Sequence, residues 1–169
     1  DVLRLPDGSA TRLKVRSMVG LLPLCASTVF ESETVTRHPR LMELIALFGE
    51  RYPEVVAKVA PTAEGFAGQR DRRLLSPLSR ERLERVLGYL LDEDEFLGPY
   101  GIRSLSRYRL DHPFELHIGG QDYSVSYLPA ESTNGMFGGN SNWRGPVWMP
   151  VNALIVRGLL NLYAFYGDD

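Results

Sequence analysis

Apolar and polar residues follow a helical period through much of the chain. Between residues 79 and 96, leucines and a valine recur at intervals of three and four, which predicts a helix with one apolar face. Glu81 stands four positions before Arg85, a spacing at which opposite charges support a helix. Two further amphipathic helices are predicted within 36–61.

The first of these two helices is expected to end at Gly49, and the second to be entered through Pro53. Two other segments are apolar on nearly all sides. The segment 17–30 has Ser17 as a possible N-cap, and the segment 151–166 follows Pro150, which suits a first helical turn. A helix without a polar face is expected to be buried on every side.

Two segments instead alternate with a period of two. Residues 1–15 alternate on both sides of Pro6-Asp7-Gly8, and residues 114–128 do so around Gly119-Gly120. Proline presets one turn dihedral and glycine accepts positive φ, so each segment predicts a β-hairpin. Together with the two kinds of helix, this predicts a mainly α fold, a double-layered helical array with two β-hairpin insertions.

Composition narrows the class of protein. The 169 residues are 44% hydrophobic and 24% charged, as in an ordinary globular domain, and a net charge of -2 does not indicate a nucleic-acid partner. No apolar run is long enough to span a membrane, and Cys25 has no partner cysteine for a disulfide or a zinc site. Its apolar neighbours favour a buried structural thiol, and we expect neither a metal nor a cofactor. We expect a cytoplasmic protein.

Both tryptophans lie in the segment 138–152, GGNSNWRGPVWMPVN. Trp143 and Trp148 offer flat apolar faces on which a sugar ring can stack, and Arg144 offers five hydrogen-bond donors. Asn142 and Asn152 can donate and accept hydrogen bonds from hydroxyl groups. The segment is therefore a candidate carbohydrate site, while the structural alternative is that the indoles belong to the core and Arg144 caps a helix.

Acidic and nucleophilic residues provide few further candidates. Glu131 precedes the tryptophan segment and either reaches the same pocket or caps a helix or pairs with Arg144. The acidic run 92–95 ends an amphipathic helix and is expected to be solvated. No catalytic or metal role is expected for the three scattered histidines, and no serine has a histidine at a recognisable triad spacing. The histidines are His38, His112 and His117.

Four motifs carry a family resemblance. SNWRGPVWMPVNALIVRGLLNLYAFYGDD, VRSMVGLLPL, GPYGIRSLSRY and YLPAES together resemble the C-terminal catalytic domain of glycoside hydrolase family 63, which includes processing α-glucosidase I and bacterial glucosidase-like members. The resemblance runs over residues 1–169. It implies one incomplete domain, the middle-to-late part of an (α/α)6 toroid, and the remainder of a parent chain as partner.

The resemblance also implies a chemistry. Such enzymes are similar to inverting glycosidases acting on α-linked glucose or related sugars, which use a carboxylic acid and a carboxylate about 6.5–9.5 Å apart. Neither family motif for those acids occurs between residues 1 and 169, so no catalytic residue is predicted here and the isolated chain is expected to be inactive. Trp143, Arg144 and Trp148 carry over as substrate-pocket residues, with Asn142, Asn152 and Glu131 as further candidates.

A second hypothesis from another class remains open. The chain could be a non-catalytic helical module that binds carbohydrate or another partner. The absence of a starting methionine and the strand pattern that begins directly at Asp1 lead us to expect a piece of a longer protein. We also expect the chain expressed alone to associate, because inner helices would lose packing partners.

Overall fold

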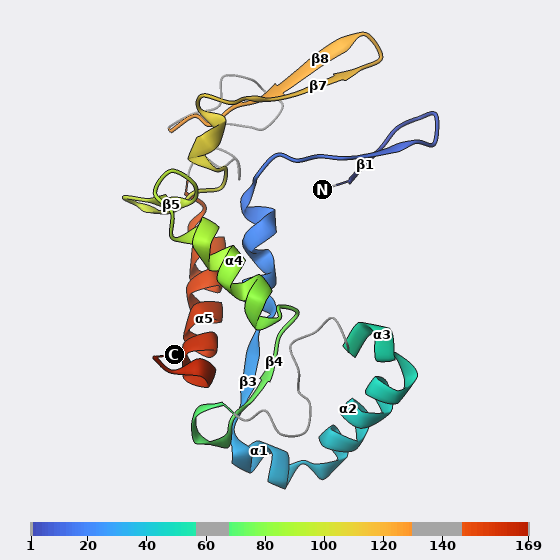
Figure 1. Cartoon of the computed structure of the whole chain (residues 1–169), viewed down its shortest axis with the longest axis vertical. Coiled ribbons are helices and arrows are strands. Elements are labelled where there is room, and N and C mark those ends of the chain that lie inside the picture. The colour runs from blue at the N-terminus through green and yellow to red at the C-terminus, as the bar shows by residue number, and fades with distance from the viewer. Residues whose placement is uncertain (1, 57–67, 130–146, 169) are drawn as a thin grey trace. The chain divides into compact units, whose positions relative to one another are not determined.

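The structure, a computed structural model, describes residues 2–56, 68–129 and 147–168 (Figure 1). The chain divides into two compact units. Residues 1–21 and 87–152 form what we call the first unit, and residues 22–86 and 153–169 form the second unit. The division falls within three helices, which are η1 (Met18–Ala26), α4 (Arg80–Leu90) and α5 (Met149–Tyr166).

The first unit contains both predicted hairpins, which are confirmed. Strand β1 (Val2–Arg4) pairs antiparallel with β2 (Ala10–Arg12), and β7 (Phe114–Ile118) pairs antiparallel with β8 (Gln121–Val125) (Figure 1). Gly119 and Gly120 have φ of 58° and 77°, the mirror-image turn that suits the twist of two strands. Gly8, at φ 84°, serves the longer turn of the first hairpin.

Short elements complete the first unit. Strand β5 (Leu97–Gly98) pairs antiparallel with β6 (Gly101–Ile102), and the 3₁₀ turn η3 (Arg107–Arg109) comes next in the chain. An isolated bridge joins Ser17 to Leu105. This pairing lays the start of η1 against the segment that precedes η3.

The second unit begins with a correction to the sequence prediction. The apolar segment 17–30 forms a 3₁₀ helix only as far as Ala26, and Thr28–Phe30 forms strand β3, paired antiparallel with β4 (Arg73–Leu75). Pro23 lies within the helix and removes one backbone donor. The strand could not be read from its own residues because its partner lies more than forty positions away.

Helices α1 (Ser32–Arg37), α2 (Pro39–Arg51) and α3 (Pro53–Val56) follow β3, and the turn η2 (Gln69–Asp71) precedes β4. The predicted end of the first amphipathic helix at Gly49 is wrong, since α2 runs to Arg51. The proline at position 53 stops it instead, because the residue before a proline is disfavoured in helical geometry. No residue of α2 is buried.

Helix α4 confirms the predicted amphipathic surface helix, although it is shorter than 79–96. Leu83 and Leu90 are buried, and Glu81 pairs with Arg85 at 3.4 Å. Arg80 pairs with Glu84 in the same way at 3.2 Å. Both ion pairs are exposed and contribute little to stability.

The core of the second unit contains a close approach between helices η1 and α5. A Cβ atom on Gly158 would lie 2.3 Å from the carbonyl oxygen of Leu24, so only glycine fits there. Ser27 Oγ lies 2.9 Å from Ser76 Oγ, and the amide of Asn161 donates to the Ser27 carbonyl at 2.9 Å. Polar groups buried beside this contact are thus hydrogen-bonded, as burial requires.

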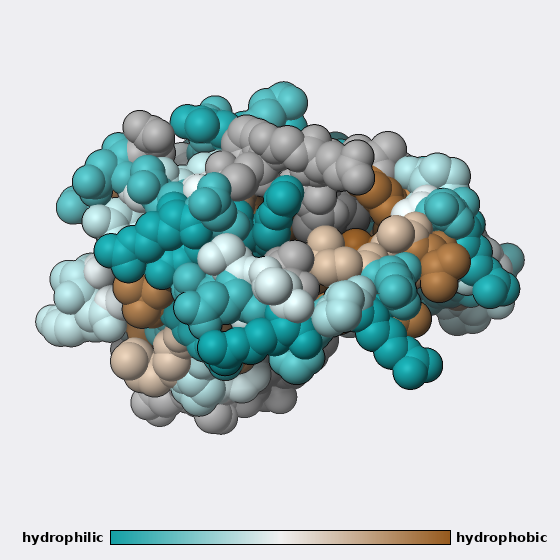
Figure 2. Space-filling model, turned by 90° about the horizontal axis from the view of Figure 1, so that it is seen from below, coloured by the Kyte–Doolittle hydropathy of each residue, from teal (hydrophilic) through white to brown (hydrophobic). Residues whose placement is uncertain are grey.

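The other side of α5 is exposed, contrary to the expectation for an apolar helix. The exposed apolar residues of α5 are Met149, Leu154, Val156, Leu160 and Tyr163, at 49–63% of their full accessibility. Figure 2 shows hydrophobic residues reaching one face of the molecule in separate groups among hydrophilic ones. The helical array and the toroid remain predictions. Among the described residues, no helix is both long and apolar enough to cross a membrane.

Candidate functional site

The described end of the tryptophan segment belongs to the first unit and is fixed by Asn152. The Oδ1 atom of Asn152 accepts a hydrogen bond from Ile102 N at 2.7 Å, and Nδ2 donates to Ile102 O at 3.0 Å. Nδ2 also donates to Trp148 O at 3.1 Å. Asn152 is 5% exposed. Its two amide hydrogens are therefore already engaged by backbone carbonyls.

Trp148 lies one step before α5, and its side chain is 42% exposed. Val147 forms a β-bridge with Arg103, the residue that follows β6, and Asn152 is bonded to Ile102 within β6. Backbone contacts therefore fix the chain on both sides of Trp148. Trp148 is thus an exposed indole on a backbone anchored from two sides. That arrangement suits a ring that contacts a ligand, and it does not seal Trp148 in the core.

Gly101 makes room for this anchor. Its φ is +132°, and a Cβ atom there would lie 2.9 Å from both Asn152 Oδ1 and Val147 Cγ1. The backbone of β6 can approach Asn152 this closely only because position 101 has no side chain. The motif GPYGIRSLSRY is therefore tied to the tryptophan motif by direct contact, although the two are about fifty residues apart.

The other predicted pocket residues lie outside the described residues; they are Glu131, Asn142, Trp143 and Arg144. Their role as substrate-binding residues remains a prediction. The same holds for the general acid and base, which were expected outside the chain. Within the described ranges, no group of three or more His, Cys, Asp and Glu side chains could hold a metal ion.

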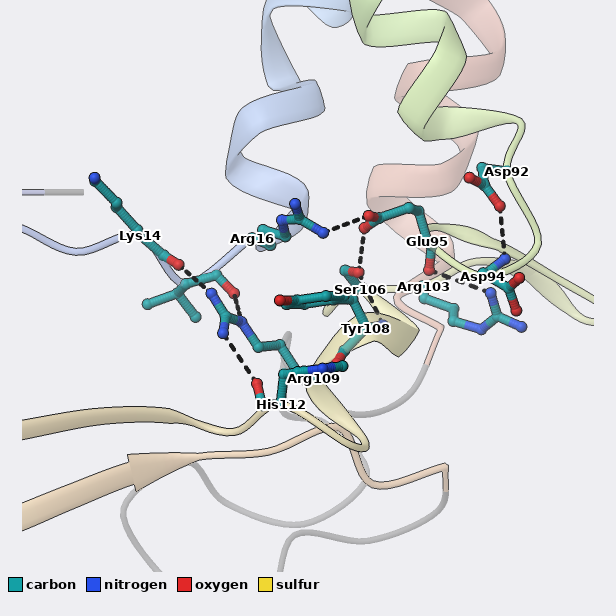
Figure 3. A network of polar contacts seen from close by, with 11 residues as sticks. Lys14, Arg16, Asp92, Asp94, Glu95, Arg103, Ser106, Tyr108, Arg109 and His112 are labelled. Carbon is teal, nitrogen blue, oxygen red and sulfur yellow. Dashed lines mark hydrogen bonds and ion pairs between the residues drawn. The ribbon is translucent and has the colours of Figure 1, made fainter.

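Sequence reasoning missed a polar network centred on Glu95 (Figure 3). The acidic run 92–95 was expected to be solvated, and this is wrong for Glu95, which is 9% exposed. Its Oε1 lies 2.5 Å from Arg16 Nη1, and its Oε2 accepts a hydrogen bond from Ser106 Oγ. Ser106 Oγ in turn accepts from Tyr108 N at 3.1 Å.

Backbone geometry explains why Glu95 and Arg16 meet. Arg16 has a left-handed φ of 56°, which is uncommon for a residue with a side chain. Its carbonyl accepts a hydrogen bond from Ser106 N at 3.0 Å, and Met18 N donates to Ser104 O at 2.9 Å. The antiparallel pairing of segments 16–18 and 104–106 places the Arg16 guanidinium beside the Glu95 carboxylate. No local signal in the sequence marks this contact, because it joins residues 79 positions apart.

Arg103 holds the loop that carries Glu95. Its guanidinium is buried, and Nη1 donates to three backbone carbonyls, those of Glu93 at 2.7 Å, Glu95 at 3.2 Å and Leu97 at 2.7 Å. One positive group thereby joins three carbonyls of this loop, and the Glu95 carbonyl also accepts from Arg107 N at 2.9 Å. Arg103 thus contacts the Glu95 loop through its side chain and Val147 through its backbone.

The aromatic ring of Tyr108 is covered on both faces. Arg16 Cζ lies 4.2 Å from the ring centroid, and the His112 ring stacks on Tyr108 at 4.2 Å with an interplanar angle of 5°. Figure 3 shows Tyr108 between these two residues. A ring sandwiched in this way has no free face for a sugar, so Trp148 and not Tyr108 is the described stacking candidate.

Cys25, in the second unit, is half-buried, and burial raises the pKa of its thiol from the ordinary value. A raised pKa leaves less thiolate at neutral pH and disfavours a nucleophilic role.

Comparison with known proteins identifies the class as glycoside hydrolases. Residues 74–168 match the model of the mannosylglycerate hydrolase MGH1-like glycoside hydrolase domain, and the chain belongs to this family. The matched range contains both tryptophans, Gly101 and Asn152. It agrees with the resemblance to glycoside hydrolase family 63 at the level of the broad family.

Two relatives are similar to the chain. YMR196W of Saccharomyces cerevisiae, an uncharacterized protein, is 46% identical over 159 residues, which are 94% of this chain and 14% of that protein. A probable mannosyl-oligosaccharide glucosidase of Schizosaccharomyces pombe is 32% identical over 90 residues, which are 53% of this chain and 8% of that protein. The chain therefore spans a small part of the length of these relatives. No solved structure matches it.

Proposed function

We propose that the chain is part of an inverting glycosidase that acts on α-linked glucose or a related sugar, and that it supplies part of the substrate pocket. The observation that carries the proposal is the family match over 74–168, which includes the tryptophan motif and its anchor. The likeness to a probable mannosyl-oligosaccharide glucosidase supports a glucoside substrate.

In this proposal Trp148 stacks on one face of a sugar ring, with Trp143 and Arg144 completing the contact. Stacking suits the described geometry because the indole is exposed while the backbone beneath it is anchored by Asn152. Asn152 then acts as a positioning residue and not as a direct ligand, since both its amide hydrogens are bound to carbonyls. The general acid and base lie outside residues 1–169.

The test uses the intact protein with α-glucosides, α-glucosylglycerate and α-mannosylglycerate. We expect hydrolysis of at least one of them, with the β-anomer of the released sugar appearing first by proton NMR, since inversion converts α to β. A retained α-anomer would contradict inversion. No hydrolysis combined with sugar binding would favour the non-catalytic carbohydrate-binding module.

Trp148→Ala tests the role of the indole, and Tyr123→Ala is its matched control, because Tyr123 lies in β8 of the same unit and is 38% exposed, against 42% for Trp148. Loss of a stacking contact worth about 1.4 kcal/mol would lower kcat/KM about tenfold. Tyr123→Ala should leave kcat/KM unchanged. Equal kcat/KM for the wild type and Trp148→Ala would remove Trp148 from the pocket.

A further inference from the structure

A cavity of about 560 Å³ opens in the first unit, beside the Arg16 and Tyr108 pair. Residues of the segment between Leu13 and Gly20 line it, together with Tyr108 and Arg109. This volume lies within the range of pockets that hold small organic ligands. The glycosidase proposal makes no use of this cavity.

The lining of the cavity is cationic. Lys14, Arg16 and Arg109 all contribute to it, and no acidic side chain does so among the described lining residues. Glu95 neutralises Arg16 from behind the lining. Lys14 and Arg109 leave a local excess of two positive charges, which favours an anionic ligand.

Arg109 is a fixed part of this wall. Its Nε donates to Val15 O at 3.0 Å, Nη1 to His112 O at 2.9 Å and Nη2 to Lys14 O at 2.5 Å. Those partners are neutral carbonyls, so they orient the guanidinium without cancelling its charge. Burial, and then the nearby charge of Arg16, lower the pKa of Arg109 from its ordinary value. The negative charge of a bound anion would favour the charged guanidinium and so offset both effects.

Lys14 is the residue of the cavity lining whose side chain is free to change conformation. Its side chain is exposed, and within the described part of the chain its ammonium group has no ion-pair partner. Figure 3 shows it extending away from the polar network, while its carbonyl accepts from Arg109. A lysine on a flexible stem can close on a ligand at little cost to the fold.

We propose that this pocket binds a small organic oxyanion, either a carboxylate or a phosphate group, between Lys14 and the wall formed by Arg16 and Arg109. A neutral sugar is disfavoured because both faces of Tyr108 are already covered, so that no stacking surface remains. The proposal does not rest on the glycosidase function, because its test measures anion binding and requires no hydrolysis of a substrate.

The experiment is titration calorimetry of the intact protein at low ionic strength with D-glycerate, glycerol phosphate and glycerol. We expect at least one of the anions to bind at millimolar concentration or below, and glycerol not to bind. Binding of glycerate alone assigns a carboxylate, and binding of glycerol phosphate alone assigns a phosphate ester.

The Lys14→Glu variant places a negative charge at the pocket, and Arg12→Glu makes the same change two residues away, on β2, at an exposed residue outside the lining. We expect Lys14→Glu to weaken binding tenfold or more and Arg12→Glu to change it less than twofold. If neither glycerate nor glycerol phosphate binds, the proposal is wrong. Equal weakening by the two variants would overturn it as well.

Discussion

The side-chain amide of Asn152 forms two hydrogen bonds with the backbone of Ile102, as a residue of a neighbouring strand would do. Asn152 Oδ1 accepts from Ile102 N at 2.7 Å, and Asn152 Nδ2 donates to Ile102 O at 3.0 Å. The side chain thereby satisfies both backbone groups of a residue in β6. It also reaches Trp148 O at 3.1 Å, which connects β6 to the start of α5.

Replacing Asn152 with alanine should therefore loosen β6. Two backbone groups of Ile102 would be left without partners, and a buried unsatisfied group costs about 1–3 kcal/mol. We expect the amide of Ile102 to exchange with deuterium at least tenfold faster in Asn152→Ala than in the wild type. Gln121→Ala, an exposed substitution in β8, is the control. Unchanged exchange at Ile102 would show that the pair contributes no protection.

Gly101→Ala should be destabilising for two reasons that add. The new Cβ atom would lie 2.9 Å from Asn152 Oδ1 and Val147 Cγ1, and φ of +132° is unfavourable for alanine. We expect a loss of about 2 kcal/mol or more in the free energy of unfolding, measured by urea denaturation of the intact protein.

Gly88→Ala is the matched comparison for this substitution. Gly88 lies within α4, where an added Cβ meets nothing within 4 Å. Alanine is the better helix former by about 1 kcal/mol, so this variant should be more stable than the wild type. A stabilising Gly101→Ala would contradict the close approach between β6 and Asn152.

Two neighbouring acids allow the buried network to be tested. Glu95→Gln removes the charge that pairs with Arg16, and Glu93→Gln removes an exposed charge from the same acidic run. Breaking a buried pair costs about 3–5 kcal/mol, but Arg16 is 38% exposed, and water screens it. We expect Glu95→Gln to lose about 1–3 kcal/mol and Glu93→Gln less than about 0.5 kcal/mol, by urea denaturation. Equal losses for the two variants would contradict the buried pair and would indicate that Glu95 is solvated like the acids beside it.

Local chemistry made the hairpins and the amphipathic helix predictable. Gly119-Gly120 between alternating residues specifies its turn without help from the rest of the chain, and the period of α4 specifies which face is apolar. The strand Thr28–Phe30 was read as the end of a helix because its apolar residues fit either structure, and only pairing with β4 decides between them.

The site was predictable to a smaller extent. The composition around Trp148 indicated a sugar-binding segment, and this stays a prediction; the structure shows that the Trp148 side chain is exposed. The part played by Asn152 was less visible, because an amide can bind a sugar hydroxyl or a backbone group equally well. Glu95 was missed because the acids beside it are exposed and its partner Arg16 lies in a distant segment.

The exposed apolar side of α5 affects how the chain behaves at different concentrations. Side chains such as Leu160, at 63% exposure, favour contact between copies of the chain. Association that involves only the folded form stabilises it by mass action. A melting temperature measured on the isolated chain will then rise with protein concentration, and values from different laboratories will agree only at matched dilution.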